Sequence, residues 1–305
     1  MSVKWQRNYV LTVQLVDGSI ETIQYPLTLE FYIRRQNWSS TNEAQFRIYN
    51  LNQKSRTGIR RDWQDFTDYR SLKLQAGYGP PPYPTIFNGN MFEAESWRDS
   101  GSPNFITQMT GKDYIFSTVT GIVNTTLAAG VSKNKVVETL SNAVINAPST
   151  LGGSSGSTGL GIGYVTNAYN GMTYPRGRVL FGNAWQILQQ ETGNSCYIDN
   201  GNLNILQNND VFVGGIPTID SSTGLLSTPK KREAFLDIEI LFEPNIQIGQ
   251  MINLQSVSEP DFNGNYKVVG LEHRGIISGS VNGKCTTKLT LFTLTQYNQI
   301  SEQGF

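Results

Sequence analysis

The sequence carries no excess of charge of either sign. Its 305 residues include 24 lysines and arginines and 24 aspartates and glutamates. Proteins that collect nucleic acid through its phosphates need a positive field, and a balanced chain does not supply one. Only 16% of the residues are charged, whereas uncharged polar residues and glycine are abundant, a composition common in all-β assemblies. We therefore expect neither a specific nucleic-acid ligand nor a free metabolic enzyme.

Cysteine is almost absent. Cys196 and Cys285 are far apart in the sequence, and neither belongs to a CxxC motif or to a cluster with histidine. Zinc sites and disulfide frameworks normally need such clusters. We therefore expect two free thiols.

Long apolar runs are missing as well. No run approaches the roughly 20 residues that a membrane-spanning helix needs. The first residues include Lys4 and Arg7, but the run after them alternates with polar residues and soon reaches Asp17-Gly18, which is not a signal-peptide core. We expect a soluble protein that is made in the cytoplasm and does not insert into a membrane.

The N-terminal region has the alternating pattern of β-strands. Two alternating runs between residues 10 and 23 flank Asp17-Gly18, which is a hairpin signal. In "LTLEFYIRR", apolar residues recur at every second position and share one face of a strand. Ile59, Trp63 and Phe66 are spaced for a short amphipathic helix or turn. Residues 1–120 are predicted to form a first antiparallel β-barrel.

The middle of the chain has a different pattern. Ser132 is a suitable N-cap for a helix that continues to residue 147, and a second helix is predicted to end at Gly193. Asn200-Gly201 then predicts a hairpin, and a Gly/Ser-rich stretch at residues 149–163 predicts a loop. Residues 121–214 are therefore predicted to form a small α+β domain.

Strands return after residue 214. In "AFLDIEILF", the set that includes Ile238, Ile240 and Phe242 is the better core face, with Asp237 and Glu239 on the other. Residues 215–305 are predicted to form a second β-barrel. The predicted fold is mainly β, with two antiparallel β-barrel domains and a small α+β domain inserted between them.

Several stretches resemble a known family when they are taken in order. The N-terminal ones are "FRIYNLNQKSRTGIR", "LKLQAGYG", "IFNGNMFEAE" and "FITQMTGKD", and the C-terminal ones are "LFEPNIQIGQMINLQS" and "FNGNYKVVGLEHRG". Together they resemble the two barrels of baseplate hub proteins from contractile-tailed bacteriophages. The resemblance covers about residues 1–118 and 232–295, and the middle region matches in character only.

The resemblance implies a structural virion protein without enzymatic activity. Hub proteins of this kind are similar in being homotrimers, in which two barrels per subunit give a pseudo-hexameric ring. Such a ring would join the tail tube to the central spike and would let the genome pass through its lumen without binding it specifically. The implied partners are other copies of the chain, the spike, tube or tube-initiator proteins and baseplate wedge proteins. The implied location is the tail baseplate.

Strands such as "TTKLTLFTLTQYNQ" combine uncharged polar residues with modestly apolar ones. A face shared with another subunit would have this composition, because charge is depleted in the cores of interfaces. Ordinary half-buried strands of an antiparallel sheet have it too. Both interpretations remain open at the level of sequence.

The only histidine, His273, follows Glu272 in "YKVVGLEHRG". A hydrolytic triad needs a nucleophile, a histidine that activates it and a carboxylate that orients the histidine. Strand alternation places Glu272 and His273 on opposite faces, so Glu272 is not expected to orient the ring. We expect His273 next to the strand end, near the surface, as a structural or solvated residue.

Glu93 and Glu95 in "FEAESW" share a strand face. Two carboxylates are the minimum for glycoside hydrolysis, so the alternative function is a tail-associated cell-wall hydrolase with Glu93 or Glu95 as the acid. Glycosidase carboxylates normally flank a cleft on separate elements, and this favours a solvated strand face instead. A carbohydrate-binding or fibre module is a third hypothesis, but the five tryptophans are scattered along the chain.

Two further patterns predict no chemistry. Gly159, Gly161 and Gly163 lack the Lys-Ser/Thr pair and the strand-to-helix context of a phosphate-binding loop, so a plain loop is predicted. The basic stretches are short, and we expect them to form salt bridges at the rim. They are Lys230 to Glu233 ("KKRE"), Arg34-Arg35 and Arg60-Arg61. The sequence thus predicts no catalytic residue, no cofactor and no metal ligand.

Overall fold

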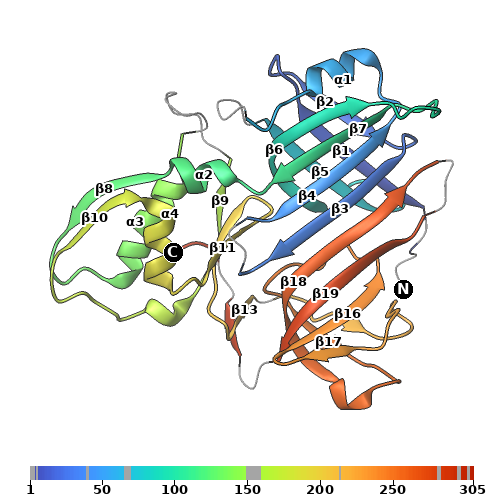
Figure 1. The fold of residues 1–305 in the computed structure, drawn as a ribbon. Coiled ribbons are helices and arrows are strands. Elements are labelled where there is room, and N and C mark those ends of the chain that lie inside the picture. Colours follow the sequence, from blue (N-terminus) through green and yellow to red (C-terminus); the bar gives the residue numbers. More distant parts are fainter. Residues whose placement is uncertain are drawn as a thin grey trace.

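In the computed structural model, a large curved sheet lies beside a smaller part that contains the longer helices (Figure 1). The structure describes residues 4, 6–38, 41–64, 70–148, 159–212, 214–279, 283–293, 297–300 and 303–305. Within these residues, 13 strands belong to the large sheet.

The N-terminal strands form one half of this sheet, in the order β3-β4-β7-β6-β5-β1-β2. The turn between β1 and β2 contains Gly18 at φ +81°, a conformation that glycine adopts without strain, and it confirms the predicted hairpin. The elements are β1 (Arg7–Gln14), β2 (Ile20–Gln24), β3 (Leu29–Gln36), β4 (Glu43–Tyr49), α1 (Gln53–Ile59), β5 (Ser71–Tyr78), β6 (Thr85–Trp97) and β7 (Ile106–Lys112).

The C-terminal strands form the other half. Along β16 the core face that includes Ile238 and Ile240 is buried, as the alternation predicts. The elements are β14 (Thr218–Ile219), β15 (Lys230–Arg232), β16 (Phe235–Leu241), β17 (Met251–Leu254), the 3₁₀ helix η2 (Pro260–Phe262), β18 (Gly264–Ile277) and β19 (Cys285–Thr293).

The two halves are joined by direct strand pairing. β18 pairs antiparallel with β3 over eight residue pairs, from Gly270 with Gln36 to Ile277 with Leu29. The prediction of a mainly β fold is confirmed. Two separate closed barrels are not confirmed, because this ladder makes one continuous sheet that begins at β15 and ends at β2. Within the described residues, no ladder connects these two end strands.

The middle region carries the longer helices and small sheets. Ser132 caps α3 by accepting a hydrogen bond from the backbone N–H of Lys135, and Gly193 ends α4 at φ +64°, so both predicted helix ends are confirmed. The Asn200-Gly201 hairpin joins β11 to β12. The elements are α2 (Ile115–Thr120), β8 (Ile122–Leu127), α3 (Lys133–Ile145), β9 (Gly161–Val165), η1 (Asn167–Tyr169), β10 (Arg178–Asn183), α4 (Ala184–Thr192), β11 (Cys196–Asp199), β12 (Asn202–Ile205) and β13 (Asp210–Phe212), which pairs with β20 (Asn298–Ile300).

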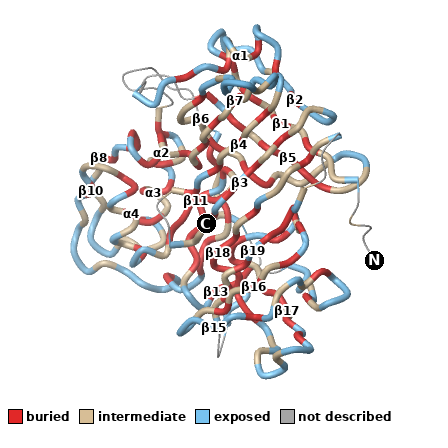
Figure 2. Tube along the Cα trace, turned by 45° about the vertical axis from the view of Figure 1, so that its right-hand side comes forward, coloured by how far each residue is buried: buried red, intermediate tan, exposed pale blue. Residues whose placement is uncertain are grey.

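Three clusters of buried hydrophobic residues form the core, and Figure 2 shows buried backbone in both the large sheet and the middle region. The first cluster lies under the N-terminal strands but also includes Phe242, Ile277 and Cys285 from the C-terminal part of the chain. The second is confined to the middle region, and the third lies mainly under the C-terminal strands. The domain boundaries at residues 120 and 214 remain a prediction.

The predicted helix around Ile59 is shorter than its spacing suggested. α1 begins at Gln53, capped by Asn52, and ends at the buried Ile59. Trp63 lies beyond the helix and is exposed, and Phe66 lies outside the described residues. The amphipathic spacing therefore located the buried end of a helix but not its extent.

Candidate functional surfaces and a buried polar junction

His273 is completely buried within β18, so the expectation of a surface position is wrong. β3 pairs on one side of it and β19 on the other, and β18 continues for four further residues to Ile277. Its Nδ1 atom lies 2.8 Å from Thr287 Oγ1, and the ring packs edge-on against Phe242. Burial and the nearby Arg35 guanidinium hold the pKa of His273 well below its usual range. A neutral, enclosed imidazole has no access to a substrate.

Glu272 points away from this ring, as the alternation predicts. Its carboxylate accepts a hydrogen bond from the Tyr32 hydroxyl at 3.1 Å and lies 3.8 Å from Lys288 Nζ. Both partners lie on the outer face of the sheet. Glu272 therefore does not orient His273, and the two residues do not form part of a triad.

Glu93 and Glu95 lie on β6 and face Thr110 and Gln108 on β7. Partners two residues apart on the neighbouring strand place both glutamates on the same face, which confirms that part of the prediction. Glu95 is exposed and Glu93 is half-buried. Both carboxylates come from one strand, so the structure does not bring them together from separate elements around a substrate.

The glycine-rich segment is not entirely a loop. Gly161 and Gly163 lie in β9, which pairs parallel with β12, and only Gly159 precedes the strand. A side chain at Gly163 would collide with Asn204, because an added Cβ would lie 2.2 Å from the Asn204 amide oxygen. Close strand packing, and not phosphate binding, accounts for this glycine. Residues 149–158 of the predicted loop lie outside the described residues.

The basic stretches divide into surface and buried residues. Arg232 on β15 pairs with Asp237 at 2.6 Å on the surface, which confirms the predicted salt bridge for this stretch. Arg35 and Arg61 are buried, so a rim position is wrong for both. Arg35 continues the buried face of β3 that includes Phe31 and Ile33. The period-two pattern, extended by one step, was the signal that could have located it.

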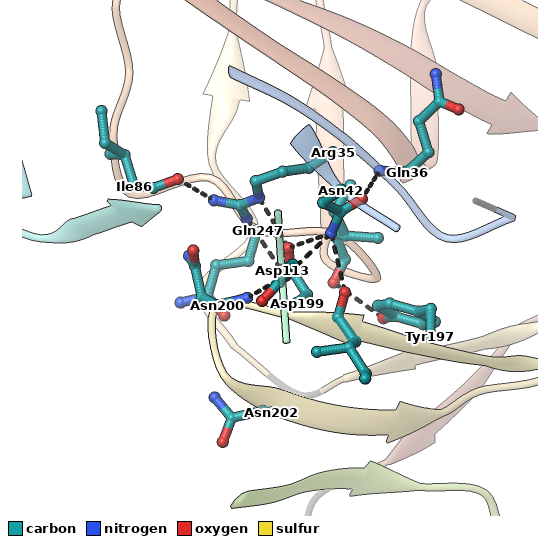
Figure 3. A network of polar contacts seen from close by, with 12 residues as sticks. Arg35, Gln36, Asn42, Ile86, Asp113, Tyr197, Asp199, Asn200, Asn202 and Gln247 are labelled. Atoms are coloured by element: carbon teal, nitrogen blue, oxygen red, sulfur yellow. Dashed lines mark hydrogen bonds and ion pairs between the residues drawn. The ribbon is translucent and has the colours of Figure 1, made fainter. Parts of the chain in front are cut away.

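Arg35 is the centre of a buried polar junction that joins the large sheet to the middle region (Figure 3). Its guanidinium lies 2.8 Å from Asp199 Oδ1 through Nε and donates from a terminal nitrogen to Asp199 Oδ2 at 2.9 Å. Another terminal nitrogen donates to the Ile86 carbonyl oxygen. Asn42 adds a hydrogen bond from its side-chain amide to the Ile198 carbonyl oxygen at 2.9 Å. Strands from three parts of the sequence are thereby held by one arginine and one asparagine.

A second carboxylate, Asp113, lies in the same junction. Its Oδ2 accepts from the backbone N–H of Asn200 at 3.1 Å and from Asn42 at 3.3 Å, whereas its Oδ1 has no hydrogen-bond partner within the described residues. Burial, and then the negative charge of Asp199, raise the pKa of Asp113 to about 7. The Arg35 guanidinium thus acts on two buried carboxyl groups. Burial raises the pKa of both, and that of Asp113 reaches about 7.

Lys267 forms a further buried contact between β18 and the middle region. Its ammonium donates to the backbone carbonyl oxygens of Gln207 at 2.9 Å and Asn208 at 3.2 Å. Burial lowers the pKa of Lys267 to about 8, against the effect of the Asp210 carboxylate. Carbonyl oxygens compensate part of the desolvation of the charge. Like Arg35, this lysine fixes the middle region against the sheet.

The outer face of the sheet carries a row of charges that alternate in sign from strand to strand. We call these six residues the charge row, and each lies opposite the next in the strand register. They are Glu239 (β16), Lys288 (β19), Glu272 (β18), Arg34 (β3), Glu43 (β4) and Lys112 (β7). Three residues of each sign give the row no net charge. Opposite charges on facing residues stabilise antiparallel strands.

Neighbouring side chains extend this pairing. Lys284 Nζ lies 2.7 Å from Glu239, and Lys112 Nζ lies 3.8 Å from Glu43. A hollow of about 640 Å³ lies over the β16 to β3 part of the row, with Trp38 and Arg232 among its lining residues. The charge row is therefore polar and electrically balanced, in contrast to a phosphate-binding surface.

The two cysteines are buried, and the described residues contain no metal-ligand cluster. Cys196 and Cys285 are buried free thiols, as predicted, and burial raises the pKa of each to about 11. Among the described residues, no three histidine, cysteine or carboxylate side chains gather as metal ligands, and no helix is long and apolar enough to cross a membrane. The stretch proposed as a shared face lies largely in β19, between β16 and β18, so ordinary half-buried pairing explains it up to residue 293.

Comparison with known proteins identifies the chain as similar to phage tail components. A family model described as "Baseplate hub gp41" matches residues 10–276. A tail protein from Neisseria meningitidis MC58 superposes with a TM-score of 0.57 at 11% identity, over 93% of this chain and 96% of that one. The 43 kDa tail protein of prophage MuSo2 from Shewanella oneidensis gives 0.57 at 8% identity, over 94% and 96%. Both likenesses concern the fold. No curated protein matches the sequence significantly.

Proposed function

The chain belongs to the baseplate hub gp41 family, and from this premise we propose that three copies form a pseudo-hexameric ring that joins the tail tube to the central spike. Membership makes the chain a structural component of the tail baseplate. The finer parts of the proposal concern the number of subunits, their neighbours and the passage of the genome.

The observation that carries the proposal is the ladder between β3 and β18. It places an N-terminal and a C-terminal half-sheet side by side in one chain, with their outer faces continuous. Three such chains offer six half-sheets around an axis, which is how a three-fold assembly can meet a six-fold tube on one side. Pairing or covering of the end strands β2 and β15 in a ring would also protect them from non-specific strand addition.

The charge row supports a role as the lumen surface. DNA that moves through a channel has to be neither held by excess positive charge nor repelled strongly by excess negative charge. Three acidic and three basic residues that face each other across β16, β19, β18, β3, β4 and β7 meet this condition. We infer that the genome passes along this face without specific binding.

The proposed partners are the central spike, tube or tube-initiator proteins and baseplate wedge proteins, as the family resemblance implies. Assembly in the host cytoplasm before incorporation into the virion belongs to the same proposal. The family is structural, and the enclosed His273 and the same-strand Glu93 and Glu95 supply no observation in favour of a hydrolase.

Light scattering of the purified chain, alone and with its cognate spike, tests the proposal. One chain has a mass of 33.9 kDa, and the expected particle has three times this mass, at least when the spike is present. The spike alone provides the baseline for the mixed sample. A chain that stays monomeric in both conditions would overturn the trimeric ring.

A further inference from the structure

β8 and β10 form a two-stranded ribbon that belongs to no other sheet in the described structure. The ribbon lies at the far side of the middle region from the large sheet (Figure 1). Its inner face carries Val123 and Leu180, which are buried in the same hydrophobic cluster as residues of α3 and α4. The ribbon is thus fixed to the protein by one face only.

Its outer face exposes large apolar side chains. Ile122 is 73% exposed, Val179 71% and Phe181 74%. In the register, Phe181 lies opposite Asn124 and Val179 opposite Thr126, so these uncharged residues share the outer face. Val119, also exposed, lies at one end, where its carbonyl oxygen accepts a hydrogen bond from Asn183. We call these six residues the ribbon face: Val119, Ile122, Asn124, Thr126, Val179 and Phe181.

The charges at the other end of the ribbon face are mainly basic. Arg176 is exposed and, within the described residues, has no ion pair. Arg178 pairs with Glu191, but two-fifths of its side chain remains exposed. The ribbon face itself carries no charged residue. The ribbon face is therefore largely apolar along its length, and Arg176 adds one exposed positive charge beyond its end.

We propose that the ribbon face is the docking surface for a different baseplate protein, whose contact surface is apolar and bordered by carboxylates. Contiguous exposed apolar groups on a soluble protein mark interaction sites, and aromatic residues at their centre carry much of the affinity. Carboxylates on the partner complement Arg176 and the exposed part of Arg178 and fix the orientation of the contact.

A second copy of the chain fits this surface less well, which is where the inference rests on the proposed function. Face-to-face packing of two identical ribbons requires a two-fold axis, whereas a three-subunit ring has only a three-fold axis, so a neighbouring copy could cover the ribbon only with a different part of its surface. The ribbon also lies away from β2 and β15, the end strands of the large sheet (Figure 2). We therefore assign the ribbon to contacts outside the ring.

A photo-crosslinking residue introduced by Phe181→p-benzoylphenylalanine in assembled particles tests the proposal. We expect a crosslink to one other virion protein, at an apolar segment that has aspartate or glutamate nearby. The same residue introduced at the exposed Val257, far from the ribbon in the sequence, is the control for random labelling. A crosslink to another copy of this chain, or labelling no stronger than at Val257, would overturn the assignment.

Titration of the purified partner against the hub then measures the apolar and the charged contributions to binding separately. Phe181→Ser is expected to weaken binding by roughly 30-fold, as for a central aromatic contact, and Arg176→Glu to weaken it and reverse the effect of salt. Unchanged binding of Phe181→Ser would contradict the apolar contact, and unchanged binding of Arg176→Glu would contradict the carboxylates on the partner. The mass of each variant by light scattering separates this failure from failure of the trimer, because the variants should still form the ring.

Discussion

Arg35 on β3 and Asp199 on β11 are 164 residues apart in the sequence, yet Arg35 Nε lies 2.8 Å from Asp199 Oδ1 in the interior of the protein. The pair connects the large sheet to the hairpin that follows β11. Removing one member would leave the other charge buried without compensation, which costs far more than losing a surface ion pair. We therefore expect the junction to contribute strongly to how the middle region sits on the sheet.

Replacing Asp199 should destabilise the protein strongly. We expect Asp199→Ala to lower the free energy of unfolding in urea by about 3–5 kcal/mol. The double variant Arg35→Met with Asp199→Leu should recover part of this loss, because it removes the uncompensated guanidinium. Glu138→Ala, which breaks the exposed pair with Lys135 on α3, is the control and should cost at most about 0.5 kcal/mol. A loss at Asp199 as small as that at Glu138 would contradict the role of the junction.

Asp113 should make stability fall as the pH rises. Its pKa is about 7 in the folded protein, against 3.8 for an unperturbed aspartate. Between these pH values the folded state binds more protons than the unfolded chain, so this contribution to stability decreases as the pH rises and is gone above pH 7. Asp113→Asn mimics the protonated carboxyl. We expect the variant to match the wild type near pH 4 and to exceed it above pH 7 by about 1–3 kcal/mol.

The comparison of urea unfolding at several pH values checks this prediction. Asp199, Arg35, Asn42 and Asn200 are the groups that contact or act on Asp113, and all of them remain in the variant. Asp261→Asn, an exposed change in η2, controls for the loss of one carboxylate. Parallel pH profiles of wild type and Asp113→Asn would show that Asp113 is ionised in the fold.

His273 should not titrate in the folded protein near pH 6.5. Because its folded pKa is well below the value of 6.5, the unfolded chain binds more protons as the pH falls through 6.5, and stability declines in that range. The chain has one histidine, so a single imidazole signal can be followed by NMR. We expect the imidazole chemical shift to stay constant from pH 7.5 to 5.5 in the folded state. In urea it should titrate with a midpoint near pH 6.5. A folded-state midpoint near 6.5 would mean that the ring is solvated.

Local patterns predicted many elements, because their causes are local. Ser132 and Gly193 define helix ends through hydrogen bonds and backbone conformation within a few residues. Alternation along "AFLDIEILF" likewise gave the buried face of β16. The joining of β3 to β18 was not predicted, because any two exposed strand edges with compatible faces can pair, and the sequence does not specify which do.

Buried polar residues were the main source of error. Arg35, Arg61 and His273 were expected at the surface because their charge or polarity makes burial costly. Each is buried with hydrogen-bond or ion-pair partners that lie on other elements: Asp199 for Arg35, the Phe92 carbonyl oxygen for Arg61 and Thr287 for His273. Such compensation depends on tertiary contacts. Only the period-two pattern of β3, in which Arg35 follows Ile33 on the buried face, carried a signal for it.

The wild-type protein should not degrade cell wall. Glu93 and Glu95 lie on the same face of β6, whereas glycosidases place an acid and its partner carboxylate on either side of the bond they cleave. We expect no clearing on a peptidoglycan zymogram from the wild type, Glu93→Gln or Glu95→Gln, with lysozyme as the positive control. Clearing by the wild type that is lost in one of the variants would establish the hydrolase instead.

Making the charge row uniformly basic should slow the passage of DNA. Changing Glu43, Glu239 and Glu272 to lysine converts three acidic positions into basic ones, so that all six residues of the charge row are positive. Phosphate contacts release counterions, so the logarithm of the DNA-binding constant falls with the logarithm of the salt concentration by about 0.9 per contact. We expect slower genome ejection from particles that carry the triple variant. The rate should also depend more steeply on salt, by up to the slope that about three added phosphate contacts produce.

The same change made elsewhere separates charge on this face from charge in general. Asp99, Glu138 and Asp261 lie outside the charge row, in a loop, on α3 and in η2, and their replacement by lysine adds the same charge. Like charges on facing strands also destabilise a sheet by up to about 1 kcal/mol per pair, so folding of both variants has to be verified by thermal unfolding before ejection is compared. If the charge row lines the channel, only the first variant slows ejection, and the delay shortens as salt is raised. Equal ejection rates for the two variants would place the charge row outside the DNA path.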